Sequence, residues 1–438
     1  MFSEARRELR GTDKIIKEET AMTAKENYDA RLQRVMDAIE MRTPDRVPMI
    51  PQVQTYPFAH AGHSMEQIYY DADLAAEDMK AYLREYEPDM ASSFTTPQAG
   101  TAPIWEKLQT NMFQWPGMEG GHVDKNSVFQ YVEKEYMQGD EYEMFFNDYT
   151  GWVFNKCLPR IYRSMECFAN VDLGAVRGYS EPAMTMQFMD PRIVDAFQRL
   201  ADAGRMSLEY FQKAGKYEAE VEEMGFPMMV GATTTVAFDS LSDTLRGTIG
   251  TMEDIMVQPE NVKRAVEMLY PSSLYAAVGQ MQNARGKFVF IPLHKGLEGF
   301  LSPEQYDEFY WPTFKRLVDD LVYKFGYTVM VYTEGKYDSR LERIADLPKG
   351  KVFYCFEDVD NAYAKKTLDK DFCLCGGFNS WILQTGTVEQ VKDAVKRHLD
   401  IMAVDGGYIF DLADTLDFGA KPENVAAMFE TVKTYGKY

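Results

Sequence analysis

The chain has 438 residues, with 45% hydrophobic and 26% charged residues, which is enough for two average domains or one large α/β barrel with insertions. Its formal net charge of −21 excludes nucleic acid and anionic membrane surfaces as main partners, because like charges repel. Five scattered cysteines form no disulfide framework, and the N-terminus lacks the apolar segment of a signal peptide. We therefore expect a cytoplasmic protein without a membrane span.

The first elements in the chain belong to a charged N-terminal segment. Residues 1–30 are rich in charged residues and in helix-forming residues, which predicts a helical N-terminal extension. Such an extension could contact a second copy in a homo-oligomer. The remaining residues, 31–438, are predicted to form the main domain.

Strand-like and helix-like stretches alternate along the main domain. The predicted strands are residues 47–52, 88–94, 226–235, 288–294, 327–335, 352–357, 372–378 and 408–414. The clearest helical patterns cover residues 32–40, 260–283, 303–325, 387–405 and 422–435. Several strands are near-continuous apolar runs, which is typical of parallel strands buried on both faces. Eight strands with intervening helices predict an α/β fold of the (β/α)₈ TIM barrel class.

A long insertion interrupts this alternation after the second strand. Residues 96–224 are rich in Trp, Tyr, Phe, Gly and Met, and a structureless loop of this length is uncommon. We predict an inserted subdomain of helices and short strands. In a barrel it would rise from the catalytic face, where it could act as a lid.

Polar side chains end several of the predicted strands, where a TIM barrel places its reactive groups. The predicted catalytic residues are Glu334, Tyr332 and His294, and the predicted substrate-binding residues are Gln52, Gln54, Thr234, Asn379 and Glu357. Because side chains alternate along a strand, Tyr332 and Glu334 share one face.

Several of these assignments have a structural alternative. Glu334 could act as a ligand, a general base or a hydrogen-bond acceptor, or it could form an ion pair with Lys336 or Arg340. His294 could equally cap a strand. Asp411 and Asp414 both follow the last strand, and the pattern leaves open which one faces the pocket.

The remaining histidines and cysteines of note favour structural roles. Cys373 and Cys375 lie in an apolar run and lack the C-x-x-C spacing of a metal site, so we interpret them as core thiols. His60 and His63 follow the first strand, where a helix start is favoured over substrate contact.

Four stretches resemble the uroporphyrinogen decarboxylase superfamily. They are RLQRVMDAIEMRTPDRVPMI (31–50), HKGLEGFLSPEQYDEFYWPTFKRLVDDL (294–321), LCGGFNSWILQTGTVEQVKDAVKRHLD (374–400) and the C-terminal segment 405–438. The resemblance implies a (β/α)₈ barrel, in agreement with the strand count. True uroporphyrinogen decarboxylases carry an arginine-rich R-Q-A-G-R segment after the first strand, whereas PQVQTYPFAHAGH (51–63) has no arginine to hold a polycarboxylate.

The chain looks closer to the corrinoid-dependent methyltransferase branch, which includes methylcobalamin:coenzyme M methyltransferases. In that branch a zinc ion activates a nucleophile or polarises a methyl donor. The His-x-Cys pair of the thiol-activating members corresponds to Tyr332-x-Glu334, and their late cysteine corresponds to Asp414 or a neighbour. The resemblance thus implies an oxygen and nitrogen site of His294, Glu334 and Asp414 for zinc or another divalent metal.

The predicted function is therefore a methyltransferase that moves a methyl group between a small donor and a corrinoid (cobalamin). A partner protein would present the corrinoid, because no cobalamin-binding D-x-H-x-x-G motif is found in the chain. Two alternatives stay open. One is a decarboxylase of a small carboxylic acid, and the other is a non-catalytic barrel that binds a corrinoid or a substrate.

Overall fold

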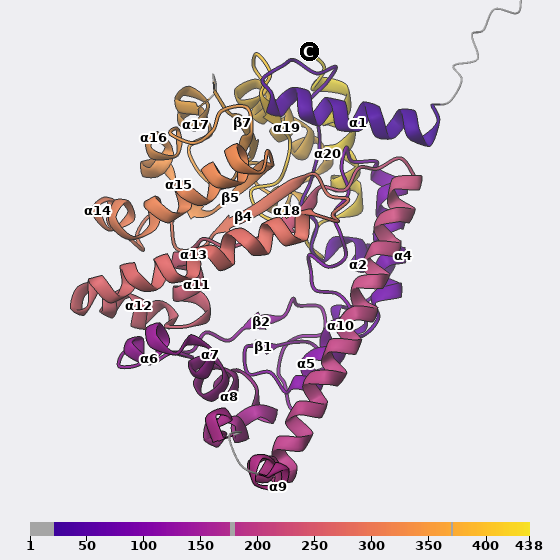
Figure 1. Cartoon of the computed structure of the whole chain (residues 1–438). Coiled ribbons are helices and arrows are strands. Elements are labelled where there is room, and N and C mark those ends of the chain that lie inside the picture. The colour runs from indigo at the N-terminus through magenta and orange to yellow at the C-terminus, as the bar shows by residue number, and fades with distance from the viewer. Residues whose placement is uncertain (1–21, 176–179, 369–370) are drawn as a thin grey trace, which may run out of the picture.

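The computed structural model describes residues 22–175, 180–368 and 371–438, and a parallel sheet lies at its centre (Figure 1). Six strands are hydrogen-bonded in chain order: β3 (Val230–Thr233), β4 (Phe288–Leu293), β5 (Thr328–Lys336), β6 (Val352–Asp358), β7 (Cys373–Gly376) and β8 (Tyr408–Ile409). The parallel pairing of consecutive strands confirms the expected α/β alternation.

Two further segments close this sheet into a barrel. Met49 forms a parallel bridge with Phe410, and the Asp89 N–H donates to the Met49 carbonyl at 2.7 Å. Ala91 forms a parallel bridge with Met228, immediately before β3. The segments around Met49 and Ala91 therefore occupy the first two strand positions, and the predicted (β/α)₈ barrel is confirmed.

The first two predicted strands, 47–52 and 88–94, are wrong as continuous strands, because only isolated bridges occur there. Pro48 and Pro51 have no N–H group for a ladder, which shortens regular pairing in the first segment. The Met49 N–H donates to the Asp89 side chain at 2.7 Å, so a carboxylate takes the place of a strand carbonyl.

Helices surround the barrel and follow its strands. Outside the insertion they are α1 (Ala24–Ile39), α2 (Tyr56–Ala61), α3 (Met65–Tyr70), α4 (Ala72–Tyr86), α11 (Ala237–Thr244), α12 (Gly247–Val257), α13 (Pro259–Met281), α14 (Pro303–Gln305), η6 (Tyr306–Tyr310), α15 (Trp311–Asp319), η7 (Asp320–Lys324), η8 (Asp338–Arg340), α16 (Leu341–Ile344), α17 (Asn361–Leu368), α18 (Trp381–Thr385), α19 (Val388–Met402) and α20 (Pro422–Tyr435). The predicted helix 303–325 is helical over 303–324, with π-turns at η6 and η7. None of the described helices is long and apolar enough to cross a membrane.

The interior of the barrel is apolar at the end where the strands begin. Helix α1 begins at a capping box between Thr23 and Glu26, and it buries its C-terminal residues against the sheet. Phe288, Met330 and Phe353 from three neighbouring strands fill this layer and are fully buried. The predicted N-terminal extension, residues 1–30, lies largely outside the described residues, and its last part is the start of α1.

The segment between the second and third strand positions lies at the end of the molecule opposite α1 and the C-terminus (Figure 1). It contains α5 (Ala102–Leu108), β1 (Phe113–Gln114), β2 (Gln130–Tyr131), α6 (Tyr142–Asn147), α7 (Tyr149–Trp152), η2 (Val153–Cys157), α8 (Leu158–Ile161), η3 (Arg163–Asn170), η4 (Leu173–Ala175), α9 (Glu181–Thr185), η5 (Met186–Met189) and α10 (Pro191–Glu223). The long α10 returns the chain to the barrel along α4 and α5. The limits 96–224 for an inserted subdomain stay a prediction.

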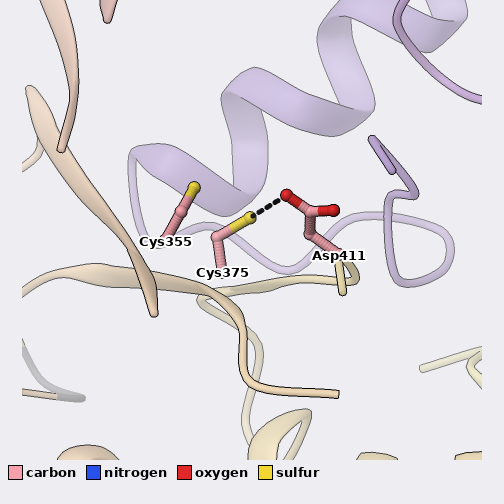
Figure 2. Close-up of side chains that lie close together, drawn as sticks. All are labelled: Cys355, Cys375 and Asp411. Atoms are coloured by element: carbon pink, nitrogen blue, oxygen red, sulfur yellow. Dashed lines mark hydrogen bonds between the residues drawn. The ribbon is translucent and has the colours of Figure 1, made fainter. Parts of the chain in front are cut away.

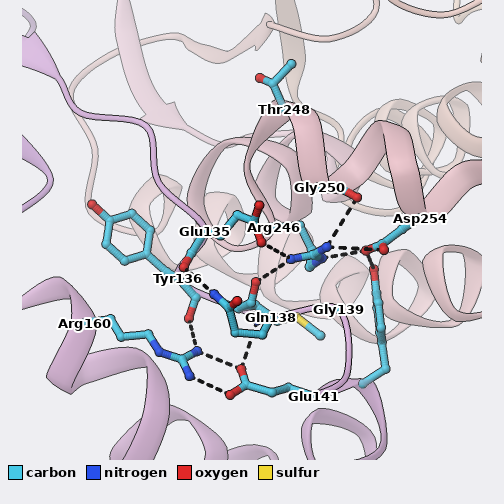
Figure 3. Close-up of polar contacts among 12 residues, drawn as sticks. Glu135, Tyr136, Gln138, Gly139, Glu141, Arg160, Arg246, Thr248, Gly250 and Asp254 are labelled. Atoms are coloured by element: carbon cyan, nitrogen blue, oxygen red, sulfur yellow. Dashed lines mark hydrogen bonds and ion pairs between the residues drawn. The ribbon is translucent and has the colours of Figure 1, made fainter.

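A buried arginine attaches this segment to the barrel (Figure 3). Arg246, between α11 and α12, bonds Asp254 at 2.5 Å, Glu135 at 2.9 Å and the Met137 carbonyl at 2.6 Å. Its side chain and that of Asp254 are only 4% and 5% exposed. Removing one partner of such a pair leaves an uncompensated buried charge, so Arg246 is the principal anchor of residues 135–137.

Candidate active site

A histidine stands between two carboxylates where β4 and β5 end. His294 follows β4 directly, and its Nδ1 lies 2.6 Å from Asp243 Oδ2 in α11. Its Nε2 lies 3.4 Å from Glu334 Oε1 in β5. Carboxyl-terminal strand ends form the catalytic face of a TIM barrel, so this cluster occupies the expected place for chemistry.

A second carboxylate of α11 holds the turn that carries His294. Asp239 is fully buried and accepts the backbone N–H groups of His294 at 3.3 Å and of Lys295 at 3.0 Å. It also accepts the Tyr310 hydroxyl at 2.8 Å. These three donors fix the backbone after β4, and with it the position of the imidazole.

Lys295 connects the cluster to α12. Its Nζ lies 3.2 Å from Asp243 Oδ1 and 2.9 Å from Thr248 Oγ1. Thr248 in turn donates its hydroxyl to Glu133 at 2.9 Å, and the Tyr131 hydroxyl donates to the Asp243 carbonyl. Residues of the predicted insertion therefore contact α11, which carries Asp243, and the start of α12.

A bulge in β5 sets the direction of Glu334. The register with β6 shifts between Thr333 and Lys336, which is a common device beside active sites. Gly335 has a φ of +65°, and a Cβ there would lie 3.0 Å from the Leu297 side chain, so glycine suits both the backbone and the packing. The Gly335 N–H donates to Glu357 Oε2 at 2.6 Å, which links the bulge to the end of β6.

The surroundings shift the protonation of the cluster. Burial lowers the pKa of His294, but hydrogen bonding to Asp243 and the charges of Glu334 and Asp239 outweigh it and raise this pKa to about 9. Burial and the charge of Asp243 raise the pKa of Asp239 to about 7. Burial also raises the pKa of Glu334, against the opposing effect of His294. At neutral pH the cluster thus holds an imidazolium that can donate a proton.

The other predicted site residues have protein partners of their own. The Tyr332 hydroxyl donates to the Ala413 carbonyl at 3.1 Å, and burial raises its pKa. Thr234 donates to the Ser273 carbonyl at 2.7 Å and is buried against α13, so its hydroxyl is engaged within the protein. The exposed Asn379 accepts the Trp381 N–H at 3.0 Å, and Gln54 accepts the Thr415 hydroxyl at 3.1 Å.

Asp411 and Asp414 occupy different environments after β8. Asp411 is fully buried and accepts the backbone and side-chain N–H groups of Gln52 at 2.9 and 3.1 Å. Burial raises the pKa of Asp411 to about 7. Asp414 is partly buried, and its Oδ1 is buried with no hydrogen-bond partner in the described part of the chain. Asp411 therefore belongs to the barrel interior, and Asp414 offers an unused acceptor.

The ligand set implied by the resemblance does not come together. His294 and Glu334 are adjacent, but Asp414 does not join them within the 4.8 Å that three donors around one ion require. Both nitrogens of His294 face carboxylates, and those carboxylates belong to Asp243 and Glu334 and not to Asp414. These residues do not fit a zinc ion at His294, Glu334 and Asp414.

A different group of donors lies deeper in the barrel (Figure 2). Cys355 in β6, Cys375 in β7 and Asp411 after β8 place their ligand atoms within 4.8 Å of one another. All three are fully buried, and among the described residues they form the one group of three or more such side chains. The arrangement is compatible with a metal ion. Our interpretation of Cys375 as an ordinary core thiol overlooked this proximity.

Asp239 and Asp243 are members of the candidate site that the sequence pattern did not single out. They stand four residues apart in FDSLSD, on one helix face directly after the third strand. That spacing places both carboxylates on the same side of α11, which is a recognisable signal. Lys295 was also overlooked, although it adjoins His294.

Comparisons with known proteins agree with the fold. Residues 169–435, more than half of the chain, match the family model of uroporphyrinogen decarboxylase (URO-D). The uroporphyrinogen decarboxylase of Picosynechococcus sp. is 28% identical over 178 residues, which cover 37% of this chain and 48% of that protein. The chain thus matches about half the length of this curated relative.

A solved structure of a methyltransferase from Methanosarcina mazei has the same overall fold. The TM-score is 0.60 at 12% sequence identity, and the match covers 94% of this chain and 99% of that chain. At this identity the likeness concerns the fold alone. Together with the family match over residues 169–435, it leads to one conclusion. The chain belongs to the uroporphyrinogen decarboxylase family.

Proposed function

We propose that this family member transfers a methyl group between a small O- or N-methyl compound and a corrinoid on a partner protein. The observation that carries the proposal is the His294 ring between Asp243 and Glu334 at the catalytic face of the barrel. The methyltransferase from Methanosarcina mazei, which shares the fold over nearly the whole chain, supports the same reaction class.

The chemistry of methyl transfer calls for a proton donor of this kind. When a methyl group leaves an ether, the C–O bond breaks and both bonding electrons stay on oxygen, which then needs a proton. His294 carries that proton on Nε2 at neutral pH, and Asp243 keeps the ring oriented through Nδ1. Glu334 Oε1 lies 3.4 Å from Nε2 in the resting site, and His294 passes its proton to the leaving oxygen when that oxygen arrives.

The residues around His294 suit a corrinoid as the methyl acceptor. A corrinoid brings the electron pair for the new bond to the methyl group, so only the leaving oxygen has to be protonated. A corrinoid supplies the cobalt nucleophile that takes up the methyl group. The chain itself binds the donor at the mouth, where His294 and Glu334 are partly exposed and within reach of a small molecule.

A decarboxylase is the second candidate, favoured by the family model and by one feature of the mouth. His294 and Lys295 are adjacent cations that could hold a single substrate carboxylate. The same imidazolium would then protonate the carbanion left after carbon dioxide departs. A polycarboxylate is disfavoured, since both cations already face carboxylates in the resting protein.

A single-turnover assay separates the two candidates. The purified chain is mixed with cob(I)alamin and a panel of O-methyl and N-methyl compounds, and methylcobalamin formation is followed by visible absorption. A parallel reaction measures carbon dioxide release from small carboxylic acids. Methylcobalamin formation that is lost in His294→Gln and kept in His60→Gln supports the proposal, because His60 pairs with Glu85 away from the cluster.

Carbon dioxide release without any methylcobalamin would replace methyl transfer by decarboxylation. Equal methyl transfer by wild type and His294→Gln would overturn the role of the histidine. No turnover with either panel would favour the non-catalytic barrel.

A further inference from the structure

The cluster of Cys355, Cys375 and Asp411 takes no part in the proposed proton transfer. It lies inside the barrel, and all three side chains have 0% exposure. The neighbouring interior positions are filled by apolar side chains such as Phe353 and Ile409. Burying a carboxyl group in such a layer is costly unless it is hydrogen-bonded, and Asp411 finds its partners in the N–H groups of Gln52 and Leu412 and in the Cys375 thiol.

The barrel itself brings the three donors together. Cys355 and Cys375 are direct partners in the parallel register of β6 and β7, so both thiols project from the same level of the barrel. Asp411 follows β8, the next strand around. Figure 2 shows the Cys375 thiol directed at the carboxylate, 3.9 Å from Oδ2, with the Cys355 thiol beside it. Rigid strands hold these side chains better than loops could.

The hydrogen bonds of Asp411 orient one oxygen towards the thiols. Oδ1 accepts the backbone N–H groups of Gln52 and Leu412 at 2.9 and 2.7 Å. Oδ2 accepts the Gln52 side chain at 3.1 Å and the Cys375 thiol. Anchoring of one carboxylate oxygen by protein donors is how second-sphere groups orient a metal ligand.

We propose that Cys355, Cys375 and Asp411 bind one divalent cation of the zinc class. Two sulfurs and one oxygen suit this borderline cation, whereas magnesium and calcium require oxygen ligands. On binding, the two thiol protons leave for solvent and the sulfurs bind as thiolates, so no electron is transferred. Three protein donors leave one of the four positions of a tetrahedral ion open.

The proposal stands apart from methyl transfer. The cluster is separate from His294, which has its own carboxylate partners. Metal content is measured without any substrate or corrinoid. Failure of the methyl-transfer assay would therefore not count against the metal site. Absence of the metal would equally not count against methyl transfer.

Metal content and ligand type test the proposal directly. The full chain is produced in zinc-supplemented medium, passed through a desalting column, and analysed for zinc by elemental analysis and X-ray absorption. We expect one zinc per chain with two sulfur ligands at about 2.3 Å. This spectroscopic count needs no variant. Zinc absent from folded protein, or zinc with no sulfur neighbours, would overturn the proposal.

Variants locate the ion, with cadmium as the probe. Metal-depleted protein is refolded from urea with Cd²⁺, and the thiolate-to-metal charge-transfer band is recorded in the near ultraviolet. Cys375→Ser should lose the band and weaken binding by more than about 100-fold, beyond what losing an outer partner costs. Cys373→Ser, on the same strand but outside the group, should keep it.

His294→Gln should also keep the band. A band that survives in Cys375→Ser and in Cys355→Ser would place the metal elsewhere and refute the assignment. Circular dichroism shows whether each variant folds. If a variant does not fold, the number of sulfur ligands measured for the metal in the wild type decides whether the proposal holds.

Discussion

Two polar clusters share one barrel but handle their carboxyl groups differently. At the mouth, Asp243 and Glu334 face His294, and the cluster is partly exposed. Two residues deeper in the register, Cys355 in β6 and Cys375 in β7 face Asp411 with no exposure at all. The mouth balances its carboxylates with cations, whereas the described contacts of Asp411 come from amides and a thiol.

The difference shows how burial and partners together set the protonation state. A cation with carboxylates on both sides stays charged, so the pKa of His294 rises to about 9 despite burial. A buried carboxyl group with neutral partners loses part of its charge, and the pKa of Asp411 rises to about 7. The mouth is thus prepared to donate a proton, while burial raises the pKa of the interior thiols and of Asp411 and favours their protonated forms.

Removing the imidazole should have the largest effect. We expect His294→Gln to lower the methyl-transfer rate by about 10²- to 10⁴-fold, the usual contribution of a general acid. The free energy of unfolding at neutral pH should fall by no more than about 1 kcal/mol, because Gln keeps a hydrogen-bonding side chain of similar size. Stopped-flow spectroscopy with cob(I)alamin measures the rate, and His60→Gln is the control. A rate within twofold of wild type would show that His294 is not the proton donor, and the proposed contrast between the two clusters would fail.

Removing the anchor of residues 135–137 tests whether the mouth depends on them. Arg246→Met should lower the free energy of unfolding by about 3–5 kcal/mol, because it leaves Asp254 buried without its partner. Arg160→Met is the control, since the Arg160 side chain is 31% exposed and its pair with Glu141 lies within the insertion. Urea denaturation measures both. Equal losses would show that burial at Arg246 is unimportant.

The raised pKa of His294 predicts a pH-dependent stability. The folded-state pKa of about 9 lies above the value of about 6.5 for an unfolded histidine, so the imidazolium stabilises the fold below pH 6.5. This contribution is lost as the pH rises through 9, and partial exposure limits it to about 1 kcal/mol. Unfolding curves at pH 6 and pH 10 should converge for wild type and His294→Gln at the higher pH. A constant gap would contradict it.

The smallest effect should come from the thiols in metal-free protein. Cys375→Ala removes one buried sulfur, and we expect a loss of about 1 kcal/mol by urea denaturation. With zinc present the gap should widen, because a ligand that binds the folded state adds stability to wild type alone. Cys373→Ala serves as the matched control, for which zinc should leave the gap unchanged.

The barrel and its catalytic end could be predicted from local pattern. Apolar strands with polar ends can be recognised in the sequence, because side chains alternate along each strand. Tyr332 and Glu334 share a face for the same reason. The structure also places His294 beside Glu334, as two strand ends at one edge would suggest. The first two strands were over-extended, since prolines and the Asp89 side chain interrupt their pairing.

The fold class and the polar strand ends can be recognised in the sequence, because both follow from residues close together in the chain. Which of those polar groups meet depends on how the strands and helices pack. The pairing of His294 with Asp243, and of Cys355 with Cys375 and Asp411, depends on the register between neighbouring strands and on the direction of a helix face. These contacts join residues far apart in sequence, and no local periodicity records them.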